Sequence, residues 1–117
     1  MKLKTIVDAK EPLSRLVNKE LPLKTAHDLW KIVMKANEQL GFYERKRISI
    51  LETYGEISGD IYVSKNGGTE MTDKISELLM LDVEVSFEPV DICIREDIRL
   101  TVDEIARLEP FVNFVEE

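Results

Sequence analysis

Residues able to do chemistry are few in this chain and lie far apart in its sequence. His27 is the only histidine and Cys93 is the only cysteine. A general base needs a nucleophile or a carboxylate beside it, and neither Cys93 nor Asp28 stands in such a motif. A structural zinc site needs about four Cys or His ligands. The sequence therefore predicts no catalytic residues, no metal ligands and no cofactor, and it favours a protein that is not an enzyme.

Acidic side chains gather in the second half of the chain and leave two interpretations open. Glu84, Glu88 and Asp91 fall on strand positions that we expect to face solvent. They do not fit a calcium-binding loop, which needs oxygen ligands at alternating positions around a central glycine. One interpretation is an acidic surface that imitates the phosphate backbone of a nucleic acid. The other is a solvated face that keeps a small protein in solution.

Three consecutive basic residues, 45–47, lie late in a long predicted helix. A sequence pI near 4.8 argues against a direct nucleic-acid binder, because such proteins neutralise phosphates with clustered Lys and Arg. A solvated helix face explains these residues simply. A second hypothesis is a nucleotide-like ligand held between subunits by basic and aromatic groups. The residues of that hypothetical ligand site are Tyr43, Arg45, Arg47 and Tyr54.

The charge of the chain divides near Gly55. Residues 1–54 contain eleven Lys/Arg and seven Asp/Glu, whereas residues 55–117 contain five and sixteen, so the two parts carry net charges of +4 and −11. This asymmetry favours self-association or a protein partner. With 117 residues, 44% of them apolar, the chain is expected to form one soluble domain, residues 1–117. Residues 1–55 are predicted to be mainly helical and basic, and residues 56–117 mixed and acidic.

The composition also predicts where the protein works. A single cysteine excludes an internal disulfide and fits a reducing compartment. No apolar run approaches the roughly 20 residues that a bilayer crossing requires. The first eight residues meet charge too soon to form the core of a signal peptide. We therefore expect a cytoplasmic protein with neither a membrane nor a nucleic acid as its direct partner.

The main predicted element is a helix from Leu23 to Tyr54, with Pro22 before it and Gly55 well placed to cap it. Its apolar residues recur at spacings of three and four, as in a coiled-coil seam. At 1.5 Å per residue the helix is about 48 Å long, more than a domain of this size covers with its own short elements. We expect the uncovered part to contact a second copy or another protein. The predicted contact residues are Trp30, Val33, Leu40 and Tyr43.

Shorter elements are predicted on both sides of this helix. Residues 2–7 are expected to form a strand, followed by a short helix with Pro12 in its first turn. Residues 83–94 alternate apolar and polar side chains, which predicts strands with a bulge between them. Thr101 and Glu104 are spaced as a capping box for the last helix. The predicted fold class is α+β: a helical hairpin with one long amphipathic helix, plus a small antiparallel sheet and two short helices.

The order of short motifs along the chain gives one further indication. These segments read MKLK (1–4), ANEQL (36–40), LETYGE (51–56), VEVSFEPV (83–90) and LTVDEIARLEPF (100–111). Their order resembles a family of small phage and prophage proteins of Gram-positive bacteria, although residues 57–69 depart from the charged stretch expected there. The resemblance implies a viral context and, for a phage-encoded protein, the cytoplasm of a host bacterium. It implies no catalytic residues.

The predicted function is that of a non-enzymatic, phage-type protein that acts through protein–protein interaction as a homo-oligomer. Two roles remain open within this class: virion assembly, and inhibition of a host or defence protein. The acidic surface would matter more for the second role. The alternative function is the sequestering of a small nucleotide-like signal at a site between subunits.

Overall fold

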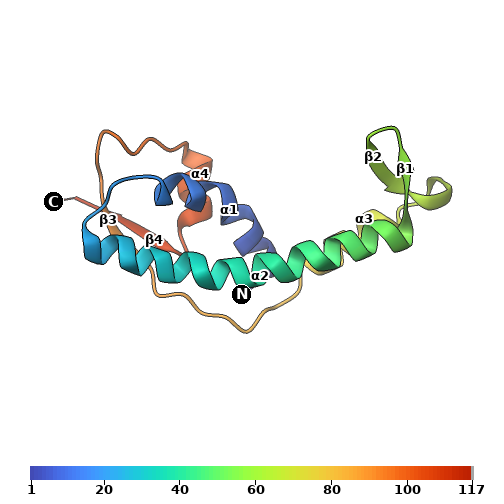
Figure 1. Ribbon diagram of the computed structural model, residues 1–117, viewed down its shortest axis with the longest axis horizontal. Helices are drawn as coiled ribbons and strands as arrows, with labels where there is room; N and C mark the ends of the chain where they lie inside the picture. The colour runs from blue at the N-terminus through green and yellow to red at the C-terminus, as the bar shows by residue number, and fades with distance from the viewer. Residues whose placement is uncertain (117) are drawn as a thin grey trace.

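Helix α2 (Leu23–Tyr54) spans most of the length of the molecule, and the other elements are arranged around it (Figure 1). The computed structural model describes residues 1–116, and its dimensions are 57 × 29 × 19 Å. The helix has the predicted bounds and continues through Gly41 without interruption. The radius of gyration is 17.1 Å, against about 13 Å for a compact domain of this length. The long helix therefore makes the protein elongated.

The hydrophobic core lies at one end of the molecule, which we call the core end. There α1 (Leu3–Val17), β3 (Val90–Cys93), α4 (Val102–Leu108) and β4 (Val112–Val115) pack together on the first half of α2. Phe111 is fully buried, and its ring meets that of Phe87 edge to face, with 4.8 Å between centroids. The buried cluster consists of Ile6, Ala9, Leu13, Leu16, Leu29, Ile32, Ala36, Val90, Ile92, Leu108, Phe111 and Val112.

Helix α1 corrects the prediction of a strand at residues 2–7. The helix already begins at Leu3, and its buried residues recur with helical spacing from there to Leu16. Pro12 therefore stands inside the helix rather than in its first turn, and its ring is buried against the core. A proline there removes one helical hydrogen bond. Burial of the apolar face offsets this cost.

The strand predicted from the alternation of residues 83–87 is also absent among the described residues. This segment has no strand partner, although Val83, Val85 and Phe87 pack against the core. The alternation of apolar and polar residues therefore reflects burial of one side of an extended segment, without pairing in a sheet. Strand β3 begins only at Val90 and pairs in parallel with β4, from Val90 opposite Val112 to Cys93 opposite Val115. Helix α4 lies in the crossover that a parallel pair requires.

The opposite end of the molecule, which we call the hairpin end, holds the antiparallel pair of the predicted α+β fold. Strands β1 (Gly55–Ser58) and β2 (Ile61–Ser64) form a hairpin, followed by the 3₁₀ turn η1 (Lys65–Gly67) and by α3 (Glu70–Leu79). Helix α3 packs back on the second half of α2 (Figure 1). A Cβ atom on Gly55 would lie 2.6 Å from the Leu51 carbonyl oxygen and 2.7 Å from the Met71 sulfur. The close approach of the hairpin to α2 and α3 therefore requires glycine at this position.

Residues 80–89 return from the hairpin end to the core end as an extended segment beside α2 (Figure 1). The segment is hydrogen-bonded to the start of the chain: the Leu3 amide donates to the Leu81 carbonyl, and the Val83 amide donates to the Met1 carbonyl, both at 2.8 Å. Lys2 adds an ion pair with Asp82 at 3.0 Å. The chain thus crosses between the two ends twice, once as a helix and once as this segment.

Candidate interaction surfaces

The four predicted contact residues on α2 have different surroundings in the structure. Trp30 is exposed, with 54% of its surface accessible. Val33 and Tyr43 are half-buried, and Leu40 packs against the core cluster of the same chain. Leu40 therefore contributes to folding, so that its replacement would not report on association alone. Trp30 is the predicted contact residue that the fold leaves free to meet a partner.

Two residues that define the faces of α2, Ile32 and Met34, were not predicted from the sequence. Ile32 is buried with Leu29 and Ala36, and this inner face is covered by the chain itself. Met34 is 51% exposed and lies one helical turn after Trp30. The spacing of these two exposed apolar residues could have indicated a second stripe on the helix. The outer face of α2 therefore carries its own apolar surface, distinct from the core-facing one.

Trp30 and Met34 line a groove of about 600 Å³ between α2 and the end of the return segment. Ser86, Phe87 and Glu88 form part of the opposite wall. The Lys35 ammonium reaches across and donates to the Ser86 carbonyl oxygen at 3.2 Å, which fixes the two walls to each other. We call this hollow the Trp30 groove. Its complete lining is Lys24, Asp28, Trp30, Lys31, Ile32, Met34, Lys35, Ser86, Phe87, Glu88, Pro89 and Val90.

Basic side chains predominate slightly over acidic ones in the Trp30 groove, with three lysines against Asp28 and Glu88. The Lys24 ammonium bonds to the Asp28 carboxylate at 3.0 Å. This hydrogen bond lowers the pKa of Asp28, and the nearby charge of Lys31 lowers it further. Lys31 itself forms no ion pair within residues 1–116. The groove thus offers an uncommitted cation beside an exposed aromatic ring.

His27 holds the Trp30 ring from one side. The two rings stack with 5.7 Å between their centroids and 25° between their planes. Both residues lie on α2, three positions apart. The stacking packs His27 against the indole, which lines the groove.

The hairpin carries a second apolar surface, at its tip. Ile57 is 71% exposed and Ile61 is 64% exposed. Ile57 is paired with Tyr62 and Ser58 with Ile61, so that the two isoleucines point to opposite faces of the ribbon. Gly59, with φ of +64°, begins the two-residue turn between them, where a left-handed conformation favours glycine. The tip is therefore a narrow projection with an apolar residue on each side.

The residues predicted to hold a nucleotide-like ligand between subunits all lie in the second half of α2. Arg47 is bound to Glu44 on the same helix, with its Nη2 atom 2.5 Å from the carboxylate, and this contact lowers the pKa of Glu44. The Lys74 ammonium lies 5.7 Å from the centre of the Tyr54 ring. The Trp30 groove is lined by none of Tyr43, Arg45, Arg47 and Tyr54. The hydrogen bond to Glu44 raises the pKa of the Arg47 guanidinium, and Tyr43 lies close enough to help raise it. A ligand site completed by a second copy of the chain stays a prediction.

The three acidic residues predicted on one strand face are exposed but belong to different segments. Glu84 and Glu88 lie on the unpaired return segment, whereas Asp91 is in β3. The Asp91 carboxylate accepts a hydrogen bond from the Asn113 side chain at 3.2 Å. Glu88 lines the Trp30 groove. The acidic surface is therefore less continuous than the sequence pattern suggested.

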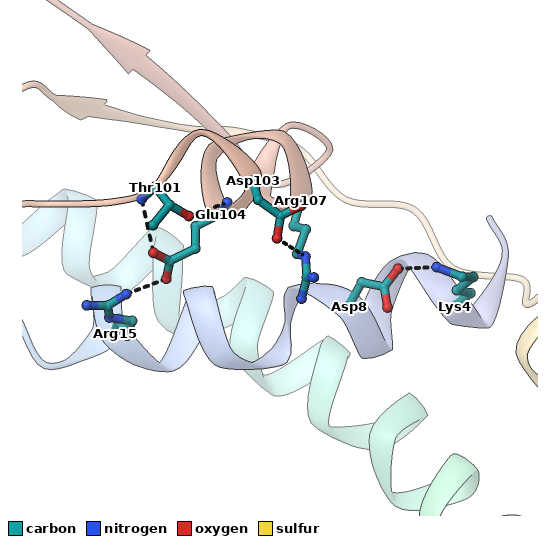
Figure 2. A network of polar contacts seen from close by, with 7 residues as sticks. All are labelled: Lys4, Asp8, Arg15, Thr101, Asp103, Glu104 and Arg107. Carbon is teal, nitrogen blue, oxygen red and sulfur yellow. Dashed lines mark hydrogen bonds and ion pairs between the residues drawn. The ribbon is translucent and has the colours of Figure 1, made fainter.

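Ionic contacts between α1 and α4 stabilise the core end (Figure 2). The Thr101 amide donates to the Glu104 carboxylate, and the Glu104 amide donates to the Thr101 hydroxyl, which confirms the predicted capping box. Arg15 of α1 reaches the same carboxylate at 2.5 Å. The hydrogen bond from the Thr101 amide, and after it that from Arg15, lower the pKa of Glu104. This network therefore fixes the last helix to the first.

Within residues 1–116, no three His, Cys, Asp or Glu side chains lie close enough together to hold a metal ion. No helix formed by these residues has both the length and the apolar character needed to cross a membrane.

Comparisons of the chain with protein families, with curated proteins and with solved structures found no match. The functional hypotheses therefore depend on the chemistry and geometry of the molecule's own surfaces.

Proposed function

We propose that this protein acts by protein–protein contact, without catalysis, and that it associates with further copies of itself. The supporting observation is that two exposed apolar surfaces, the Trp30 groove and the hairpin tip, lie toward opposite ends of an elongated molecule. Exposed aromatic and aliphatic side chains around a groove are typical anchors of protein interfaces. In a phage, such a cytoplasmic protein would serve virion assembly or inhibit a host or defence protein.

Light scattering at several protein concentrations tests this proposal. The expected result is a mass that rises from the 13.5 kDa of one chain to a defined multiple of it. A mass of one chain at every concentration would contradict self-association. It would leave only a foreign protein as the partner.

The second candidate function is the sequestering of a nucleotide-like anion. It is favoured by the exposed indole of Trp30 beside the uncommitted ammonium of Lys31, because a base can stack on one and a phosphate can bind the other. Measuring the thermal unfolding midpoint with and without nucleotides tests this candidate. A midpoint that rises with the logarithm of the free nucleotide concentration would favour it over the interaction protein.

A further inference from the structure

We infer that the hairpin tip of one copy occupies the Trp30 groove of a second copy, an inference that deepens the proposed self-association and rests on it. The occupant of the groove is thus a defined segment, residues 56–62, of another molecule of the same chain. The shape of the hairpin, its exposed apolar side chains and its charge support this assignment.

The hairpin tip has the form of an insert. It is a two-stranded ribbon with Ile57 on one face and Ile61 on the other, and both side chains are largely exposed. The Trp30 groove offers apolar surface from Trp30 and Met34 along one wall. Burying the two isoleucines there would remove exposed apolar surface from both partners.

The hairpin is acidic, and the Trp30 groove carries a small excess of basic side chains. The hairpin contains two acidic residues, Glu56 and Asp60, and no basic residue. Asp60 lies in the turn, at the point that would enter the groove first. The groove contributes Lys31, which has no ion-pair partner among the described residues. Lys24 is paired with Asp28, and Lys35 is bonded to the Ser86 carbonyl oxygen. Lys31 is therefore the lysine that we assign to Asp60. Complementary charges of this kind set the register of a contact and accelerate encounter.

The same chain cannot make this contact with itself. Trp30 and Gly55 are 25 residues apart on one continuous helix, a separation of about 38 Å along its axis. The hairpin begins at the end of that helix and projects to one side of it, at the far end of the molecule from the groove (Figure 1). The groove can therefore receive only the hairpin of another molecule.

Reciprocal charge reversal tests the contact directly. Asp60→Lys places a lysine opposite Lys31, and Lys31→Glu places a glutamate opposite Asp60, so each variant alone should associate at least about tenfold more weakly than the wild type. Mixing the two variants restores an acid–base pair at every contact. We expect the mixture to regain wild-type mass in light scattering, whether the contact closes into a dimer or repeats head to tail.

Two matched controls separate this contact from general changes in charge or hydrophobicity. Arg99→Glu makes the same change in charge as Lys31→Glu, but outside both surfaces. It should leave association unchanged. Ile57→Ser together with Ile61→Ser should abolish association, whereas Val102→Ser, at a residue that is 85% exposed on α4, should not. Because all these side chains are largely exposed, circular dichroism should show native helicity in each variant.

Trp30 supplies an independent readout, because it is the only tryptophan in the chain. Its emission should shift to shorter wavelength as wild-type protein is concentrated and should not shift in the Ile57/Ile61 variant. Association that survives the loss of both isoleucines, or a mixture that stays monomeric, would overturn the hairpin contact while leaving self-association intact. A wild type that is monomeric at all concentrations would overturn both. If ATP quenches the Trp30 emission to the same extent at every protein concentration, the groove binds an anion instead of the hairpin.

Discussion

The core end and the hairpin end of this molecule differ in how much of their apolar surface the chain itself covers. The core end contains the whole buried cluster, from Ile6 to Val112. At the hairpin end Met71 is the buried hydrophobic side chain, and Ile57 and Ile61 project into solvent. None of the α2 residues after Ala36, all of which the structure describes, is fully buried. The core end therefore supplies the buried core that folds the protein, whereas exposed apolar side chains for contact are present at both ends.

The largest effect is expected when a phenylalanine is replaced by alanine at each end of the molecule. Phe111→Ala removes a fully buried ring from the core end, and we expect a loss of about 3–5 kcal/mol in the free energy of unfolding. Phe42→Ala removes a half-buried ring from the second half of α2. It should cost well under half as much in the same urea titration. Equal losses in the free energy of unfolding would show that both ends contribute equally to stability and would contradict the difference between them.

A smaller effect is expected where the hairpin joins α2. Gly55→Ala introduces a Cβ within 2.7 Å of the Leu51 carbonyl and the Met71 sulfur, and relieving this overlap should cost about 1–3 kcal/mol. The loss should appear in hydrogen exchange as faster opening of β1 and α3, with the core end unchanged. Gly68→Ala is the matched control, because its new Cβ would lie 3.5 Å from the Lys65 carbonyl, an ordinary contact.

A gain is expected in the middle of the long helix. Gly41 lies inside α2, and a Cβ there would approach nothing closer than the Arg45 Nη1 atom at 3.5 Å. Gly41→Ala should therefore stabilise the helix by about 0.5–1 kcal/mol. If the hairpin end is the less stable one, the added protection in hydrogen exchange will be concentrated in residues 42–54. Uniform protection along the chain would contradict that distribution.

The smallest effect is a pH dependence at the core end. Hydrogen bonds from the Thr101 amide and from Arg15 lower the pKa of Glu104 in the folded protein. The stability that Glu104 contributes is therefore complete above its unfolded pKa of about 4.3 and is lost as the pH falls through the lower folded value. Glu104→Gln should be less stable than the wild type at pH 7, and the gap in urea midpoint should close in acid.

The control for this pH dependence is another acidic residue in the first turn of α4. Asp103 pairs with Arg107 on the surface, where both side chains are largely exposed. Exposed pairs contribute little to stability. Asp103→Asn should therefore leave the urea midpoint close to that of the wild type at every pH. A gap for Asp103→Asn as large as that for Glu104→Gln would remove the special role of the contact between α1 and α4.

Local signals predicted the elements that depend on the chain immediately around them. The bounds of α2 followed from Pro22, Gly55 and an uninterrupted helical pattern, and the start of α4 followed from Thr101 and Glu104. These features act over three or four residues, which is the range of helical hydrogen bonds and caps. The α+β class was predictable for the same reason.

Contacts between distant segments were not predictable in this way. The alternation of residues 83–87 looked like a strand because the core covers one side of it, but no neighbouring strand was available to pair with it. The strand expected at residues 2–7 became helix because Leu3 and Ile6 belong to the same buried stripe as Leu13. The Trp30 groove has a wall from residues 86–90, which lie more than 50 positions from Trp30 in the sequence. Only the folded chain brings these groups together.

The continuity of α2 through Gly41 also determines how accurately the hairpin can be aimed. The helix continues for 13 residues beyond Gly41 before β1 begins, a lever arm of about 20 Å. A bend of roughly 10° at Gly41 would displace the base of the hairpin by about 3.5 Å, close to the rise of one strand residue. The angular stiffness of a single helical turn therefore limits the positional error with which this molecule can present its hairpin to a neighbour.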